Sequence, residues 1–168
     1  MICDPERIDT WEVIELANRH PRVNILQPGP GVGGHCIAVD PWFIVDRSPD
    51  CSNLIRTARQ VNDAKPNWVV ERVKKCASKF KEPKIACLGL AFKADVDDLR
   101  ESPAFDIVKQ LEAGNVGELL ICEPNIREHS DFALVAVNVA VKRADIILLL
   151  VDHKEICSLK VMDLSEKG

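Results

Sequence analysis

The sequence predicts an α/β protein in which a helical region, residues 1–80, precedes a parallel-sheet domain, residues 81–168. Two observations lead to this prediction. Apolar residues recur mostly at spacings of three and four over residues 53–80, which is the period of an amphipathic helix. Beyond residue 84, short runs of consecutive apolar residues alternate with helical patterns. Such runs are typical of strands in a parallel sheet that helices cover on both faces.

The helical region opens with a predicted helix from Thr10 to about His20. Asp9 stands at its N-cap, and Glu12 occupies the position of the reciprocal acid in a capping box. Pro21 cannot continue the helix. We therefore expect an ordered helix before the composition of the chain changes.

Residues 22–51 are rich in Gly and Pro and show no helical period. They predict a long structured loop, with short extended pieces at Val23–Leu26 and Trp42–Val45. Long ordered loops in compact proteins usually carry function. The helical pattern returns over residues 53–80, where Pro66 either kinks one helix or starts a second. The apolar stripe of this segment needs a partner, so we expect a homo-oligomer through the 53–80 helix.

The sheet domain contains three apolar runs of strand length. Ser102 and Pro103 form the N-cap and first-turn pair of a helix that extends to about Ala113. A second helix is expected over Val135–Arg143, and the ending LKVMDLSEKG predicts one further short strand. The three predicted strands are Ile85–Leu90, Glu118–Cys122 and Ile146–Val151.

The composition is that of a globular protein and excludes several classes. The net charge is −4 and no basic stripe is visible, which argues against nucleic acid as a partner. No apolar stretch reaches the roughly 18 residues of a membrane-spanning helix, and residues 1–20 lack the pattern of a signal peptide. We therefore expect a cytoplasmic protein without a membrane partner.

Seven cysteines are scattered along the chain without any C-x-x-C pair, so no metal site is predicted. We expect reduced thiols that are mostly buried as small apolar side chains. Cys36 is the exception, because its surroundings in the sequence differ from those of the other six.

The segment Gly29–Gly34 satisfies the pattern G-x-G-x-x-G of a dinucleotide-binding turn. Such a turn must follow a strand and open a helix. Pro30 removes one amide that would meet a pyrophosphate, and Pro41 is expected to limit any following helix. The first acid beyond a strand-like run, Asp46, comes too early to leave room for a helix and a strand. This context argues against a dinucleotide turn.

The same glycines lead directly to a thiol, in the order Gly33-Gly34-His35-Cys36, and Asp40 follows four residues later. A stretch with little side-chain bulk lets a substrate approach the backbone closely. A cysteine thiolate is a strong nucleophile, and a nearby acid can orient a water or take a proton. From the residues alone, a catalytic Cys36 and a purely structural glycine bend both remain open.

Two blocks of the sequence resemble one known family. PGPGVGGHCIAVDP is similar to the catalytic loop of the UDP-glucose/GDP-mannose dehydrogenase family, whose pattern is G-x-G-G-x-C-x-x-x-D. LGLAFKADVDDLRESPA, at 88–104, resembles the opening of that family's C-terminal nucleotide-sugar-binding domain. The resemblance covers residues from about 2 to 153, in the family's order. It implies a central helical dimerisation region, with the catalytic cysteine loop at 22–51, followed by a Rossmann-like parallel-sheet domain.

Within the family, His35 before the cysteine and Pro41 after the aspartate resemble the UDP-N-acetylmannosamine dehydrogenases, which serve surface polysaccharide biosynthesis. The implied reaction oxidises the C6 alcohol of the sugar twice, each time giving a hydride to NAD. By this resemblance, Cys36 adds to the intermediate aldehyde as a thiohemiacetal and then becomes a thioester, which water hydrolyses to the uronate. Asp40 is implied to assist proton transfer or to activate the water.

The resemblance also implies binding residues. Gly33, Phe92 and Lys93 are expected at the UDP-sugar, Arg22 is expected to reach it from a neighbouring subunit, and Arg100 is expected to contact NAD across a domain cleft. A plainer reading stands beside each charged residue. Arg22 and Lys93 would be solvated surface charges, and Arg100 would pair with a neighbouring acid. Those acids are Asp97, Asp98 and Glu101.

The family begins with an NAD-binding Rossmann domain for which this sequence has no counterpart. The resemblance therefore implies a truncated fold and an isolated chain without turnover. The alternative is a non-catalytic UDP-sugar-binding or dimerisation module. A cysteine-dependent hydrolase is a weaker alternative, because His35 is adjacent to Cys36 and badly placed as a base, and His129 or His153 could approach only through folding.

Overall fold

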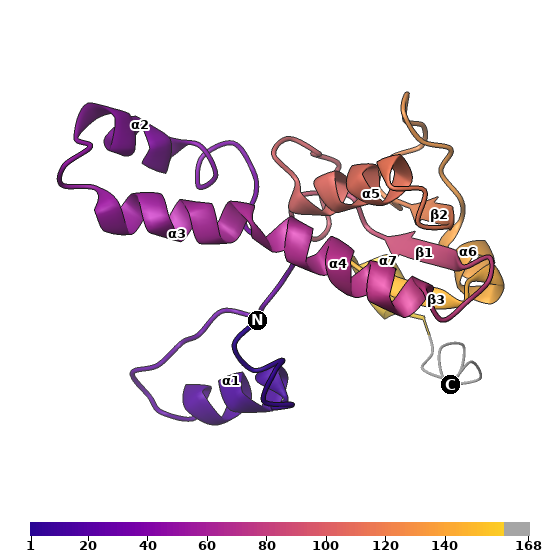
Figure 1. Cartoon of the computed structure of the whole chain (residues 1–168), viewed down its shortest axis with the longest axis horizontal. Coiled ribbons are helices and arrows are strands. Elements are labelled where there is room, and N and C mark those ends of the chain that lie inside the picture. The colour runs from indigo at the N-terminus through magenta and orange to yellow at the C-terminus, as the bar shows by residue number, and fades with distance from the viewer. Residues whose placement is uncertain (160–168) are drawn as a thin grey trace.

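The structure is a computed structural model that describes residues 1–159. Within that range the chain forms three strands and seven helices (Figure 1). The strand predicted in LKVMDLSEKG falls, apart from Leu159, outside the described residues. The strands are β1 (Lys84–Leu88), β2 (Glu118–Cys122) and β3 (Ile146–Leu149). The helices are α1 (Thr10–Asn18), α2 (Asp40–Arg47), α3 (Asn53–Asp63), α4 (Lys65–Ala77), α5 (Pro103–Ala113), α6 (Val137–Arg143) and α7 (Lys154–Cys157).

The three strands form one parallel sheet in the order β2–β1–β3. Successive side chains of the central strand point to opposite faces. Ile85 and Cys87 join a core cluster with α4 and α5, whereas Ala86 and Leu88 join a second cluster with α6. All four residues are at most 2% exposed. The prediction of an α/β fold with a helical region before a parallel sheet is therefore confirmed.

Helix α5 begins where its sequence signals predict. The Ser102 hydroxyl accepts a hydrogen bond from the Phe105 amide at 3.3 Å and donates one to the Leu90 carbonyl at 2.6 Å. One side chain therefore caps α5 and ties it to the segment that follows β1. Pro103 lies in the first turn, where its missing amide costs no hydrogen bond.

The helical region also follows its predicted caps. The Asp9 carboxylate accepts from the amides of Trp11 and Glu12 at 2.8 and 3.4 Å, as expected of an N-cap. Pro66 lies in the first turn of α4, so it starts a second helix rather than kinking a single one.

The apolar stripe of residues 53–80 is divided between two environments. On α4, Val70, Val73 and Ala77 are buried in the same cluster as α5. On α3, Leu54 and Val61 are 83% and 58% exposed. The α4 half is thus covered by its own chain, and the α3 half stays available to a partner. A division of the chain into domains near residue 80 remains a prediction.

One expectation for residues 22–51 is wrong. Trp42–Val45 is not extended but lies within α2, because Pro41 occupies the first turn of that helix and promotes it. Val23–Leu26 belongs to no helix or strand, and its extended conformation stays a prediction. Helix α2 lies alongside α3, and Figure 1 shows this pair projecting away from the sheet.

The expectation that most cysteines are buried is also wrong. Cys87 and Cys122 are buried on neighbouring strands, and burial raises the pKa of each thiol to about 12. Four thiols are instead exposed, because they lie on helices and loops outside the buried strands. The exposed cysteines are Cys36, Cys51, Cys76 and Cys157. None of the described helices is long and apolar enough to cross a membrane.

Candidate functional site

Cys36 and Asp40 are joined by one turn of helical backbone. The Cys36 carbonyl accepts hydrogen bonds from the amides of Val39 and Asp40 at 3.0 and 2.8 Å, and Asp40 is the first residue of α2. Residues four apart in such a turn lie on one side, with their Cβ atoms roughly 5–6 Å apart. The spacing C-x-x-x-D therefore presents a thiol and a carboxylate together. Both residues are exposed.

The glycines before Cys36 allow this loop to contact the segment between β1 and α5. A Cβ atom at Gly33 would collide with the Glu101 carbonyl oxygen. Gly34 has φ +88°, and a Cβ there would lie 2.9 Å from the Phe92 ring. Only glycine fits such close approaches without displacing its neighbours. Two motifs far apart in the sequence are thus held against each other, with Gly34, two residues before Cys36, against the Phe92 ring.

Polar side chains of α3 hold the other side of the glycine-rich loop. Asn62 pairs with the backbone of Val32 in both directions, accepting from the amide at 2.7 Å and donating to the carbonyl at 3.1 Å. The Arg59 guanidinium donates to the carbonyls of Val32 and Ile37 at 3.5 and 3.4 Å, and to the Asp63 carboxylate at 2.7 Å. These contacts anchor the loop on both sides of Cys36.

Arg59 is the least exposed of the charged residues on α3, at 9%. Its Nε is buried without a hydrogen-bond partner among the described residues. Sequence reasoning did not single out Arg59, Asn62 or Asp63. Their spacing of three and four residues places them on one face of the helix, which is the signal that could have identified them.

The segment between β1 and α5 carries the other predicted site residues. Its backbone closes on itself where the Phe92 amide donates to the Asp98 carbonyl at 3.1 Å. Lys93 is exposed, with its Nζ 5.5 Å from the centre of the Phe92 ring. A lysine there can face a phosphate as a mobile point charge.

Arg100 pairs with Asp98, one of the acids that its plainer reading names. The guanidinium donates to the carboxylate at 2.6 Å, and the Arg100 amide donates to it at 3.0 Å. The side-chain hydrogen bond is the larger cause that lowers the pKa of Asp98 to about 2. The contact of Arg100 with NAD stays a prediction.

A cavity of about 820 Å³ lies beside the carboxyl ends of β1 and β3. Phe92 and Lys93 line it, together with Gly29–Gly31 of the glycine-rich loop. Open α/β sheets bind ligands at this edge. Cys36 and Asp40 are not among its lining residues. The cavity therefore lies on one side of the glycine-rich loop, and the thiol is presented farther along the same loop.

Arg22 is not brought to this site within one chain. It is exposed, in a segment after α1 that Asn18 closes by bonding the backbone of Ile25 in both directions, at 2.9 and 2.6 Å. Figure 1 shows α1 and this segment apart from the α2–α3 pair. Its predicted role from a neighbouring subunit remains untested.

The described residues do not build a dinucleotide site of their own. The segment Gly29–Gly34 has no strand before it, since β1 begins at Lys84. After β1, the amides of Leu90 and Ala91 could meet an anion, but the buried Glu123 carboxylate accepts both of them. Both amides therefore already have a carboxylate as their acceptor. Nor does this part of the chain contain a cluster of three or more His, Cys, Asp or Glu side chains that could hold a metal.

The chain belongs to the UDP-glucose/GDP-mannose dehydrogenase family. Residues 1–64 match the central domain of that family, and residues 86–167 match its UDP binding domain. These are the two regions that meet at Gly34 and Phe92.

The individual relatives are longer enzymes. An NDP-N-acetyl-D-galactosaminuronic acid dehydrogenase from Ralstonia nicotianae is 58% identical over an alignment 159 positions long, which covers 92% of this chain and 38% of the relative. A UDP-N-acetyl-D-mannosamine dehydrogenase from Yersinia pestis is 52% identical over an alignment 180 positions long, which covers 99% of this chain and 43% of the relative. The chain thus spans about two fifths of the length of these relatives.

A solved structure has the same fold. The UDP-N-acetyl-mannosamine dehydrogenase from S. aureus superposes with a TM-score of 0.84 and 43% identity, over 98% of this chain and 39% of that one.

Proposed function

We propose that this chain forms the UDP-sugar-binding and nucleophile-bearing part of a UDP-sugar 6-dehydrogenase, with UDP-N-acetylmannosamine as the sugar nucleotide. One observation carries the proposal: the turn that presents Cys36 rests, through Gly34, on the ring of Phe92. A nucleotide-sugar held by the UDP binding domain would thereby have its sugar end near a thiol. Surface polysaccharide biosynthesis in the cytoplasm is the proposed setting.

The chemistry that these residues support is acyl transfer through sulfur. Cys36 would add to the C6 aldehyde as a thiohemiacetal. Transfer of a hydride and loss of a proton from that adduct, the hydride going to NAD, would give a thioester, and water would hydrolyse the thioester to the uronate and release the thiol. A thiolate suits both steps because it adds readily to a carbonyl and later departs. Asp40, one helical turn away, would take a proton or orient the attacking water.

The binding roles follow from position. Lys93, at the edge of the cavity, would neutralise the diphosphate, and Phe92 would contact the sugar. Gly33 would let the sugar approach the loop backbone, and Arg22 would come from a second copy. Arg100 would contact NAD only after partly leaving Asp98. Because the described residues form no dinucleotide site, we expect the 168-residue chain alone to show no turnover.

The sugar itself is the finer part of the proposal. One of the relatives is an NDP-N-acetyl-D-galactosaminuronic acid dehydrogenase, and the other is a UDP-N-acetyl-D-mannosamine dehydrogenase. A 2-acetamido sugar is common to both. Competition between UDP-N-acetylmannosamine and UDP-N-acetylgalactosamine for the chain would separate them, and the proposal expects tighter binding of the first.

We also propose that the chain forms a homo-oligomer, with an interface made by α2 and α3. These helices carry apolar side chains that their own chain leaves uncovered, and a second copy of the chain would bury them. The exposed residues are Phe43, Ile44, Leu54 and Val61. A non-catalytic UDP-sugar-binding or dimerisation module would keep this surface and lose the role of Cys36.

Calorimetric titration with UDP tests the binding half. We expect saturable binding by the parent chain and strong weakening in Lys93→Ala. Lys81→Ala removes another exposed lysine, at the opposite edge of the sheet, and should bind like the parent. Absence of UDP binding by the parent would refute the proposal for this chain.

A further inference from the structure

Glu123 is a buried carboxylate at the carboxyl end of β2. Its side chain is 0% exposed, which is rare for a carboxylate unless hydrogen bonds satisfy it. Oε2 accepts from the amides of Leu90 and Ala91 at 2.7 and 3.0 Å, and Oε1 accepts from the Asn125 amide at 3.0 Å. The carboxylate therefore fixes the backbone where the chain leaves β1.

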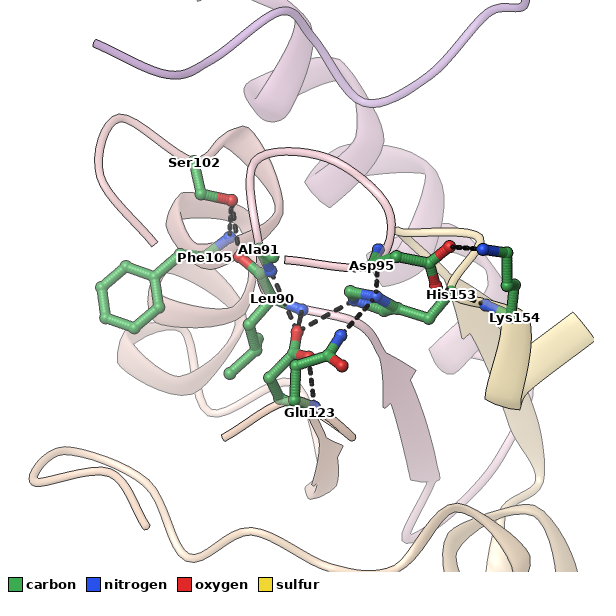
Figure 2. Close-up of polar contacts among 9 residues, drawn as sticks. Leu90, Ala91, Asp95, Ser102, Phe105, Glu123, His153 and Lys154 are labelled. Carbon is green, nitrogen blue, oxygen red and sulfur yellow. Dashed lines mark hydrogen bonds and ion pairs between the residues drawn. The ribbon is translucent and has the colours of Figure 1, made fainter. Parts of the chain in front are cut away.

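His153 follows β3 and bridges Glu123 to the next part of the same segment (Figure 2). Its Nε2 lies 3.1 Å from Glu123 Oε2, and its Nδ1 lies 2.9 Å from the Asp95 amide nitrogen. A backbone amide can only donate, so Nδ1 must be the acceptor. Nε2 then carries the proton and donates it to Glu123. The contacts thus select one neutral tautomer of a side chain that is 1% exposed.

Asp95 adopts a backbone conformation that needs such support. Its φ is +60°, in the left-handed region that side chains other than glycine rarely occupy. Besides the bond from its amide to His153, its carboxylate accepts from the Lys154 amide at 2.9 Å and from Lys154 Nζ at 3.1 Å. Contacts to one short stretch after β3 therefore hold this residue in place.

The two anchors enclose a very short stretch of chain. Glu123 holds Leu90 and Ala91, and His153 holds Asp95, so that Phe92, Lys93 and Ala94 alone lie between them. Figure 2 shows Glu123 and His153 side by side beneath this stretch. The backbone that carries Phe92 and Lys93 is consequently clamped at both ends by one buried hydrogen-bonded pair.

We propose that Glu123 and His153 are positioning residues for the sugar-nucleotide site, which set the backbone of residues 92–94 so that Phe92 and Lys93 face the ligand. This role rests on the proposed function, and it extends the site to two residues that lie outside the Cys36 loop. It requires the neutral Nε2–H tautomer, because a proton on Nδ1 would oppose the Asp95 amide. The charged groups near the imidazole are the Glu123 carboxylate, 3.1 Å from Nε2, and the Asp95 carboxylate, which pairs with Lys154.

Calorimetric titration of the 168-residue chain with UDP tests the role, because one substitution of His153 should weaken binding and a more conservative one should restore it. His153→Ala removes the hydrogen bonds of the imidazole with Glu123, Asp95 and Asn125, and should weaken UDP binding roughly tenfold, as expected when a buried polar network loses one partner. His153→Asn keeps an amide oxygen that can accept from Asp95, and should recover most of the affinity. Glu155→Gln, which changes an exposed carboxylate of α7, is the matched control and should bind like the parent.

Two readouts report on the clamp without any ligand. The ¹⁵N spectrum of the imidazole should show His153 as the Nε2–H tautomer. Amide exchange at Leu90, Ala91 and Asp95 should accelerate in Glu123→Gln while exchange at Ile107, in the core of α5, stays slow. The second comparison separates a local release of the segment from unfolding of the domain.

The outcomes distinguish this role from the function on which it rests. If the parent does not bind UDP, the proposed function and the positioning role both fail for this chain. If the parent binds UDP and His153→Ala binds equally well, the positioning role alone is overturned. An Nδ1–H tautomer would also overturn it. Weaker binding in His153→Ala with recovery in His153→Asn is the result that the role predicts.

Discussion

The sheet and the α2–α3 pair are built in opposite ways. The central strand of the sheet is buried on both faces, and its neighbours α4, α5 and α6 complete two apolar clusters. The α2–α3 pair has little core, and Arg59, Asn62 and close glycine contacts hold its loop in place. Apolar burial makes a rigid platform, whereas polar contacts to backbone leave a loop that a substrate or a second copy can reach. The candidate site lies where these two regions meet.

The largest expected loss of stability comes from truncating a buried side chain in the core that packs on the sheet. Leu111 is fully buried on α5, and Leu111→Ala should lower the free energy of unfolding by about 2–5 kcal/mol. Leu54→Ala makes the same change on α3, where the side chain is 83% exposed, and should stay within about 0.5 kcal/mol for the monomer. Urea denaturation at low protein concentration measures both. Equal losses would mean that α3 is packed as tightly as α5.

A smaller effect is expected where the two regions touch. Gly34→Ala places a methyl group 2.9 Å from the Phe92 ring at a residue with φ +88°, and should cost about 1–3 kcal/mol. Gly29→Ala is the control in the same loop, because its added Cβ meets nothing within 4 Å. Thermal unfolding should separate the two variants. Identical behaviour would show that the loop does not rest on Phe92.

Arg59 anchors the glycine-rich loop, and we expect even a substitution that keeps its positive charge to lower the stability of the loop. Arg59→Lys preserves the cation but loses the planar fork that reaches two carbonyls and Asp63, and we expect a loss of about 1–2 kcal/mol. Faster amide exchange at Val32 would locate the effect. Arg56→Lys on the same helix is the control. A Val32 amide that exchanges at the parental rate in Arg59→Lys would contradict the anchoring role.

The smallest expected effect is a loss of stability at low pH. Asp98 has a pKa near 2 in the folded chain, below its ordinary 3.8, because Arg100 hydrogen-bonds its carboxylate. A lowered folded pKa means that the pair contributes stability above about pH 3.8 and loses it progressively as the pH falls toward 2. Carboxyl NMR should give an Asp98 midpoint near 2, and Arg100→Ala should return it toward the ordinary value. A parental midpoint close to 3.8 would mean that the pair does not form in solution.

The sequence predicts the sheet region better than it predicts the loop. Consecutive apolar residues and the Ser102–Pro103 pair are local signals, and they located β2 and the start of α5. The sequence does not predict the helix at Trp42–Val45, because a proline is compatible both with the end of a helix and with its first turn, which is where Pro41 lies. The contact between Gly34 and Phe92 joins residues 58 positions apart, since 92 − 34 = 58. No local pattern encodes such a contact.

The candidate site residues also fall into two groups, those that lie in sequence motifs and those that only the fold reveals. Cys36, Asp40, Gly33, Phe92 and Lys93 follow from motifs, and their roles stay predictions. Glu123 and His153 belong to no motif that a single sequence reveals, because their partners are backbone amides of a distant segment. Buried polar side chains of this kind become visible only when the fold brings a strand end and a loop together.

The central claim is that the Cys36 turn and the Phe92–Lys93 segment form one site. It is tested most directly by alkylating the exposed cysteines in the presence and absence of UDP-N-acetylmannosamine and following each residue by mass spectrometry. Cys51 and Cys157 are exposed controls on other parts of the chain. If the two segments form one site, the sugar nucleotide should slow modification of Cys36 and leave the two controls unchanged, and Lys93→Ala should abolish the protection. Saturating sugar nucleotide that leaves Cys36 as reactive as the controls would contradict it.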